Sequence, residues 1–161
     1  MNNTLYVRDK RGEFVRADGD AVVAAAKAHL SRRLRRGTVL SNPQMVRDFL
    51  SARLGGRDVE YFCVITLDVR HGMIGYTELC RGTIDSAAVY PREVVKLALD
   101  KGAASVILAH NHPSGVAEPS CADELITKRL SAALALVDIR LLDHLIVAGS
   151  TTVSLAERGI L

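Results

Sequence analysis

The hydrophobic positions of this chain follow two patterns, one that predicts strands and one that predicts helices. Short apolar runs rich in β-branched residues predict strands over 60–68, 73–84, 105–110, 140–148 and 151–155. Apolar residues that recur every three or four positions predict helices over 42–54, 91–101 and 121–137. This order of elements predicts a mixed α+β domain, an α/β fold with a central β-sheet flanked by helices.

The N-terminal part of the chain predicts one further helix. Asp20 is a suitable cap for a helix over 21–36, and Gly37 is a suitable stop. Apolar side chains spaced for one helical face support it: Val23, Ala26, Leu30 and Leu34. We therefore expect residues 1–39 to form a basic N-terminal helical extension and residues 40–161 to form the main domain.

Charge is unevenly distributed over the 161 residues, whose formal net charge is +3. Residues 1–56 hold eleven Lys and Arg against five Asp and Glu, whereas residues 57–161 hold ten against thirteen. Four arginines cluster at the end of the N-terminal helix: Arg32, Arg33, Arg35 and Arg36. Cations there complement the helix dipole, an interpretation that we favour over a patch for nucleic acid or another acidic partner. No aromatic side chains lie among them to stack on bases, and the chain contains no Trp.

Composition argues against a membrane or secreted protein. Hydrophobic residues make up 48% of the chain, but no apolar stretch is as long as a membrane span. The first residues lack the charged and apolar regions of a secretory signal. The cysteines Cys63, Cys80 and Cys121 are odd in number and have no paired spacing. We therefore expect a cytoplasmic protein with free thiols and no membrane association.

Residues 110–123 concentrate the side chains that carry chemistry, in the sequence HNHPSGVAEPSCAD. Because side chains alternate along a strand, His110 and His112 should point the same way where a strand ends. Pro and Gly then predict a loop, after which a new helix should carry Asp123 back towards the histidines. Two His and one Asp would leave a tetrahedral zinc ion one open position for water, which is the arrangement of a catalytic site.

Simpler interpretations apply to the start of this helix. Ser120, three residues ahead of Asp123, also fits an ordinary capping box, and we expect both residues to cap the helix as well. The neighbouring Cys121 could offer a thiolate to zinc, but we favour a small residue at a helix start, because three ligands already complete the usual catalytic number. A cysteine hydrolase is less favoured still, since the sequence around Cys121 supplies no basic, thiolate-stabilising surroundings.

Several segments resemble one known family. They are RGTI at 81–84, VYPREV at 89–94, HNHPSG at 110–115 with Pro119, Ser120 and Asp123, and LDHLI at 142–146. Over about residues 40–161, they resemble the RadC-like branch of the MPN/JAMM (JAB) zinc metalloproteases. The resemblance implies an MPN/JAMM catalytic domain of cytidine-deaminase-like fold, with one zinc ion per chain bound by His110, His112 and Asp123.

The resemblance also implies roles outside the metal motif. JAMM enzymes have a catalytic glutamate at the start of an early strand, which corresponds here to Glu60 as general acid and base. Glu78, in the next strand-like segment, competes for this role. Without the family, either glutamate is more simply a solvated charge at a strand end. Ser120 would donate a hydrogen bond to the oxyanion of the tetrahedral intermediate, a role that it would share with the metal.

Asp143 and His144 place two polar groups in an apolar segment that predicts a core strand. The interpretation that we favour is a buried Asp–His hydrogen bond that fixes the sheet. The alternative is a hydrogen bond from this pair to a zinc-binding histidine, which metal sites commonly have.

The sequence supports two functions of different kinds. The first is a zinc-dependent hydrolase of peptide or isopeptide bonds, which acts by metal-activated water on a peptide or protein substrate. The second is a DNA-associated accessory protein, in repair or on mobile elements, in which the metal site is structural or regulatory. Its support is the basic N-terminal segment and the association of the RadC name with DNA repair. We favour the hydrolase, because the set of ligands, base and oxyanion donor is complete.

Overall fold

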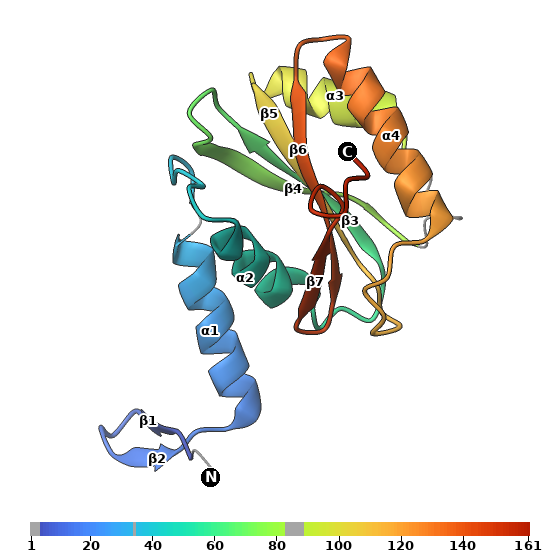
Figure 1. Cartoon of the computed structure of the whole chain (residues 1–161). Helices are drawn as coiled ribbons and strands as arrows, with labels where there is room; N and C mark the ends of the chain where they lie inside the picture. The colour runs from blue at the N-terminus through green and yellow to red at the C-terminus, as the bar shows by residue number, and fades with distance from the viewer. Residues whose placement is uncertain (1–3, 34, 83–88) are drawn as a thin grey trace.

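The computed structural model describes residues 4–33, 35–82 and 89–161, and it confirms the predicted class of fold (Figure 1). In chain order the elements are β1 (Tyr6–Arg8), β2 (Phe14–Arg16), α1 (Gly19–Arg33), α2 (Pro43–Leu54), β3 (Tyr61–Leu67), β4 (Met73–Arg81), α3 (Pro91–Asp100), β5 (Ser105–Asn111), α4 (Cys121–Ala135), β6 (Arg140–Ala148) and β7 (Thr151–Ser154). β1 and β2 form a small hairpin, and the other strands form one five-stranded sheet.

The five-stranded sheet has the order β4-β3-β5-β6-β7, which places β5 in the centre. β5 runs antiparallel to β3 and parallel to β6, and the outer pairs β3–β4 and β6–β7 are antiparallel. Every residue of β5 is buried, as its continuous apolar run suits a strand covered on both faces. The strand that carries the candidate ligand His110 is therefore the central and fully buried strand of the sheet.

Two apolar cores lie on opposite faces of this sheet, which α2 covers on one side and α3 and α4 on the other (Figure 1). The core under α2 contains Phe49, Leu50, Ile65, Ile107 and Ala109. The core under α3 and α4 contains Val64, Val94, Val106, Leu108 and Leu130. Because side chains alternate along a strand, position decides which core each residue of β5 faces. His110 follows Val106 and Leu108 towards α4, whereas Asn111 follows Ile107 and Ala109 towards α2.

The predicted capping signals of the main domain are present. Asn42 caps α2, whose first residue is Pro43, and Pro91 is the first residue of α3. β4 ends at Arg81, whereas the prediction extended to residue 84, and residues 83–88 lie outside the described part. α4 ends at Ala135 rather than at residue 137, and Asp138, with a φ of 57°, soon turns the chain away.

The N-terminal part extends away from the sheet as a hairpin followed by α1, which contacts α2 (Figure 1). α1 begins at Gly19, so Asp20 lies inside its first turn rather than at the cap, where its charge still suits the dipole. The helix predicted over 21–36 ends early, since Arg35 and Arg36 lie beyond α1. In the described part of the chain, no helix is long and apolar enough to cross a membrane.

The hairpin of β1 and β2 was not predicted from the sequence. Its turn is built by Asp9, whose Oδ1 accepts hydrogen bonds from the amides of Arg11 and Glu13 at 2.8 and 2.9 Å. Gly12 completes the turn with a φ of 84°, in the region that favours glycine. Each strand has only 3 residues and is exposed, so no alternation of buried and exposed positions marks it.

Asn42 should stabilise α2 measurably. Its Oδ1 accepts a 2.8 Å hydrogen bond from the Gln44 amide in the first turn. Asn42→Ala should lower the free energy of unfolding by about 1 kcal/mol, measured by urea denaturation. Asn42→Ser supplies another acceptor and should recover most of this stability. An equal loss in both variants would contradict the capping role.

Candidate metal centre

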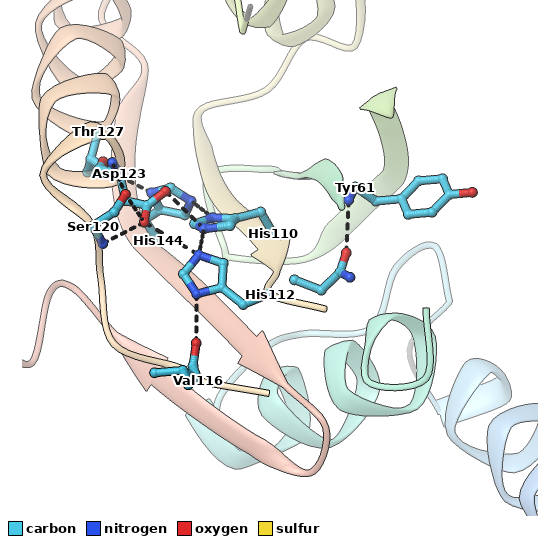
Figure 2. A network of polar contacts seen from close by, with 9 residues as sticks. Tyr61, His110, His112, Val116, Ser120, Asp123, Thr127 and His144 are labelled. Carbon is cyan, nitrogen blue, oxygen red and sulfur yellow. Dashed lines mark hydrogen bonds and ion pairs between the residues drawn. The ribbon is translucent and has the colours of Figure 1, made fainter. Parts of the chain in front are cut away.

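Three side chains, from the end of β5, the turn after it and the start of α4, converge at one point (Figure 2). His110 Nε2 lies 3.0 Å from Asp123 Oδ1 and 3.0 Å from His112 Nε2. His112 Nε2 lies 3.5 Å from the second carboxylate oxygen, Asp123 Oδ2. The side chains of His110 and Asp123 are fully buried, whereas that of His112 is 17% exposed. The site therefore opens to solvent on the His112 side.

The turn after β5 fixes the ring of His112. Gly115 has a φ of 81°, which favours glycine, and its amide donates a 3.1 Å hydrogen bond to the His112 carbonyl. The chain returns so that His112 Nδ1 lies 2.8 Å from the carbonyl oxygen of Val116. Because a carbonyl can only accept, Nδ1 carries the hydrogen, and the lone pair of Nε2 faces the site.

The first turn of α4 presents Asp123. The Ser120 hydroxyl oxygen accepts a 3.2 Å hydrogen bond from the Asp123 amide. Asp123 Oδ2 accepts one from the Ser120 amide and one from the Ser120 hydroxyl, each at 2.7 Å. The predicted capping box is thus confirmed. It holds one carboxylate oxygen and leaves Oδ1 to face His110.

The environment of Asp123 favours its ionised form. Burial alone would raise its pKa, but the neighbouring groups, which include the two Ser120 donors, outweigh burial and hold the pKa below its ordinary value. Within the described residues, Asp123 Oδ1 is buried and accepts no hydrogen bond, although His110 Nε2 is only 3.0 Å away. A buried, ionised oxygen without a donor is expensive unless a cation compensates it, so this atom suits a metal ion.

A buried chain of hydrogen bonds behind His110 begins at Thr127 (Figure 2). Thr127 Oγ1 lies 2.5 Å from the Asp123 carbonyl oxygen and 2.5 Å from His144 Nδ1. The carbonyl can only accept, so the Thr127 hydroxyl donates to it and accepts the hydrogen of His144 Nδ1. Burial holds the pKa of His144 well below its usual value. The His144 ring is therefore neutral, and its Nε2 carries no hydrogen.

This chain determines which nitrogen of His110 faces the site. His144 Nε2 lies 2.9 Å from His110 Nδ1 and accepts the hydrogen of that atom. The lone pair of His110 Nε2 is then directed towards His112 and Asp123. The ligand atoms of the three residues all lie within 4.8 Å of one another, so these residues could hold a metal ion. Hydrogen bonds to the second ring nitrogen are the usual support of metal-binding histidines.

A bulge in β6 makes this support possible. Val106 of β5 pairs with Leu141, but the next residue, Ile107, pairs with Asp143. The extra residue in β6 reverses the alternation, so Asp143 faces α2 and His144 faces α4 beside His110. Without the bulge, His144 would point to the wrong face of the sheet.

The predicted Asp143–His144 hydrogen bond is present, but only to the backbone of His144. Asp143 accepts a 2.7 Å hydrogen bond from the backbone amide of His144, not from its ring. Its carboxylate also accepts from the Ser154 hydroxyl, at 2.7 and 2.9 Å, and from the Ala156 amide at 3.2 Å. The alternative interpretation was a hydrogen bond from this pair to a zinc-binding histidine. His144 makes such a bond, to His110, whereas Asp143 does not.

Glu60 precedes the first residue of β3 and is partly buried. Strand alternation places it on the same face as Phe62, whose ring stacks on that of His110 with centroids 6.3 Å apart. On the neighbouring strand β4, Cys80 pairs with Phe62. The pKa of Cys80 is raised, first by burial and then by the charge of Glu60, which agrees with a Glu60 carboxylate on this face.

Glu78 lies on the other face of the sheet. It pairs with Cys63, which belongs to the core under α2. Its carboxylate forms a 3.2 Å ion pair with Arg57, half-exposed to solvent. The geometry therefore favours Glu60 over Glu78 as the group that faces the histidines, and the catalytic role of Glu60 stays a prediction.

The three cysteines are free thiols. Cys121 is exposed, and its sulfur is not among the ligand atoms that converge with those of His110, His112 and Asp123. This agrees with its interpretation as a small residue at a helix start.

The fold and the site together define a class, a mixed α+β domain with an open three-ligand candidate metal site at the end of its central strand. Residues 40–160 match the family model of the RadC-like JAB domain. The chain belongs to this family, as the sequence motifs predict.

Several bacterial proteins that share the name UPF0758 are similar to this chain. The one from Aeromonas hydrophila is 56% identical over 139 residues, which are 86% of this chain and 62% of that protein. The one from Methylibium petroleiphilum is 53% identical over 150 residues, 93% of this chain and 68% of that protein. The one from Halorhodospira halophila is 51% identical over 158 residues, 98% of this chain and 70% of that protein. The chain thus spans about two thirds of the length of these relatives.

Thr127→Val should weaken metal binding in a protein that still folds. Valine fills much of the same space but cannot accept the hydrogen of His144 Nδ1, so the ring of His110 loses its fixed orientation. Loss of such a partner weakens metal affinity by about 10- to 100-fold, which competition with a fluorescent zinc chelator would measure.

Thr66→Val is the matched control. It removes another buried hydroxyl, from β3, whose hydrogen bond goes to the Gly75 carbonyl at 3.4 Å. This variant should bind metal as the wild type does. Equal affinity in the Thr127 variant would contradict the role of the hydrogen-bond chain.

Proposed function

We propose that this protein is a zinc-dependent hydrolase of peptide or isopeptide bonds. The observation that carries the proposal is the convergence of His110 Nε2, His112 Nε2 and the Asp123 carboxylate, electron-pair donors whose hydrogens are directed elsewhere. The site opens to solvent beside His112, as a site for catalysis requires. Membership of the RadC-like JAB family supports the same class of reaction.

The chemistry of the donor set supports zinc as the metal. Two imidazole nitrogens and one carboxylate oxygen suit zinc, whereas calcium and magnesium prefer oxygen ligands alone. Three protein ligands leave one position for water, and one such site per chain gives one zinc ion per chain. When bound, zinc lowers the pKa of water to about 7 and polarises the carbonyl of the substrate.

Glu60 is the residue that we assign to proton transfer. It lies on the face of the sheet that carries His110, at the start of β3, and it is not a member of the ligand set. As general base it takes a proton from the attacking water, and as general acid it gives that proton to the leaving amine. Because Glu60 carries the proton, none of the three metal ligands has to be protonated during the reaction.

Ser120 is the residue that we assign to the oxyanion. In the resting protein its hydroxyl hydrogen is donated to Asp123 Oδ2 at 2.7 Å. Rotation about the side-chain bond would redirect this hydrogen to a substrate oxygen, while the Ser120 amide keeps its own 2.7 Å hydrogen bond to Asp123. The hydroxyl then donates to the negative charge that develops on the substrate carbonyl.

The substrate class that this chemistry implies is a peptide or a protein. The three free thiols suit a reducing compartment, so we place the protein in the cytoplasm. The alternative of a DNA-associated protein rests on the arginine cluster. Arg35 and Arg36 are exposed, but the side chains of Arg32 and Arg33 lie outside the described part of the chain. No contact in the described residues favours this alternative over the hydrolase.

Glu60→Gln should abolish hydrolysis but keep the metal. Loss of a general acid and base lowers turnover by about 10²- to 10⁴-fold, because glutamine cannot take up the proton. Turnover would be measured on fluorescein-labelled casein and on a fluorogenic lysine-isopeptide, with zinc content measured on the same samples.

Glu78→Gln is the matched control, since this glutamate lies on the other face of the sheet. It should keep both turnover and zinc. Removal of zinc with a chelator should stop hydrolysis in the wild type, and added zinc should restore it. A Glu60 variant as fast as the wild type would contradict the assignment.

Ser120→Ala separates capping from catalysis. The lost cap should lower the free energy of unfolding by about 1 kcal/mol, as in Asn42→Ala. The lost oxyanion donor should in addition lower kcat by about 10²-fold at saturating zinc. Asn42→Ala carries only the stability loss and is the control. An unchanged kcat in a folded, zinc-loaded Ser120 variant would leave the serine with capping alone.

A further inference from the structure

Asn111, the last residue of β5, stands between the candidate ligands His110 and His112 in the sequence. Its side chain points to the face of the sheet opposite to that of His110. It is only 2% exposed. Neither the metal ligand set nor the hydrogen-bond chain behind His110 uses it. A buried amide of this kind must have hydrogen-bond partners, and the partners of Asn111 are informative.

All of these partners are backbone groups of one segment, 57–61, some fifty positions earlier in the chain. Asn111 Oδ1 accepts a 2.9 Å hydrogen bond from the Tyr61 amide. Asn111 Nδ2 donates to the Val59 carbonyl at 3.1 Å and to the Arg57 carbonyl at 3.4 Å. The hydrogen bonds therefore fix the residues immediately before and after Glu60.

These hydrogen bonds continue the sheet beyond the end of its ladder. The described β3–β5 pairs end at Phe62 and His110. One residue further on, the side chain of Asn111 takes the place of a main-chain partner for Tyr61. Because Asn111 is the direct neighbour of both His110 and His112, it ties Glu60 to the strand end that carries two of the ligands.

We propose that Asn111 is a positioning residue that holds Glu60 in register with the metal site, an inference that rests on the proposed function. An amide suits the task because it supplies an acceptor for the Tyr61 amide and donors for two carbonyls at once. Asp would lose both donors, and Leu would lose every polar atom while filling a similar volume. Catalysis is sensitive to such placement, since a shift of about 1 Å can cost about 10²-fold in rate.

The first test uses metal-free protein and needs no substrate. Amide hydrogen exchange, followed by NMR, would be compared in the wild type, Asn111→Ala, Asn111→Leu and the control Asn42→Ala. In both Asn111 variants the Tyr61 amide loses its acceptor and should exchange at least about tenfold faster, relative to amides in the centre of β5. Asn42→Ala destabilises the protein elsewhere and should leave this ratio unchanged.

The second test measures kinetics and zinc content. Asn111→Ala should lower kcat on labelled casein by about 10- to 100-fold, with KM and zinc content close to those of the wild type. In the double variant with Glu60→Gln, the Asn111 substitution should have no further effect, because there is no longer a proton acceptor to position. A merely structural asparagine would slow both backgrounds equally or release zinc.

The outcomes separate this inference from the proposed function. Any one of three results overturns the positioning role: an unchanged Tyr61 exchange ratio, an unchanged kcat, or an equal effect of the Asn111 substitution in the Glu60→Gln background. Hydrolysis by the wild type would still support the proposed function in each case. If the wild type hydrolyses neither probe, the proposed function fails. The exchange ratio then decides alone whether Asn111 holds the Glu60 segment. The Leu variant keeps the test valid if a cavity unfolds the Ala variant.

Discussion

The hydrogen bond between His110 Nδ1 and His144 Nε2 is the interaction on which the rest of the site depends. It is fully buried and 2.9 Å long, and the Thr127 hydroxyl fixes its direction through His144 Nδ1. Because it occupies the Nδ1 hydrogen of His110, the lone pair of Nε2 must face the site. The Val116 carbonyl accepts the Nδ1 hydrogen of His112, so the lone pair of His112 Nε2 also faces the site. A metal ion would therefore meet ligands that are already in the required tautomer, without rearrangement of the protein.

Strand alternation assigns opposite tasks to neighbouring residues. His110 faces α4 and the ligand set, while Asn111, one residue on, faces α2 and the Glu60 segment. In β6 the bulge opposite Ile107 places His144 on the metal face and Asp143 on the other, where it binds Ser154 and Ala156. The sheet thus builds the site on one face and supports it from the other. Asn111 and Asp143 therefore differ in role from their sequence neighbours His110 and His144, because they lie on the other face of the sheet.

Local signals in the sequence were sufficient for much of this. The spacing of His110, His112 and Asp123 predicted their convergence, since a strand end, a tight loop and a helix start are each local features. The partners of these residues could not be predicted in the same way. The pairing of His110 with His144 depends on strand register and on a bulge, and the partners of Asn111 lie on a segment far away in the chain. No local mark in the sequence shows the bulge that places His144 beside His110. The N-terminal hairpin was missed for a related reason, since exposed strands of 3 residues carry no pattern of burial.

The central claim is that His110, His112 and Asp123 bind a metal ion. Elemental analysis of the purified protein, compared with folded His112→Ala and His29→Ala variants, tests it most directly. His29 lies on the N-terminal helix α1, outside the ligand set, and controls for the loss of any histidine. The account predicts about one zinc ion per chain in the wild type and in the His29 variant, and its loss in the His112 variant. A well-folded wild type that holds no metal, even after zinc is added back, would contradict it.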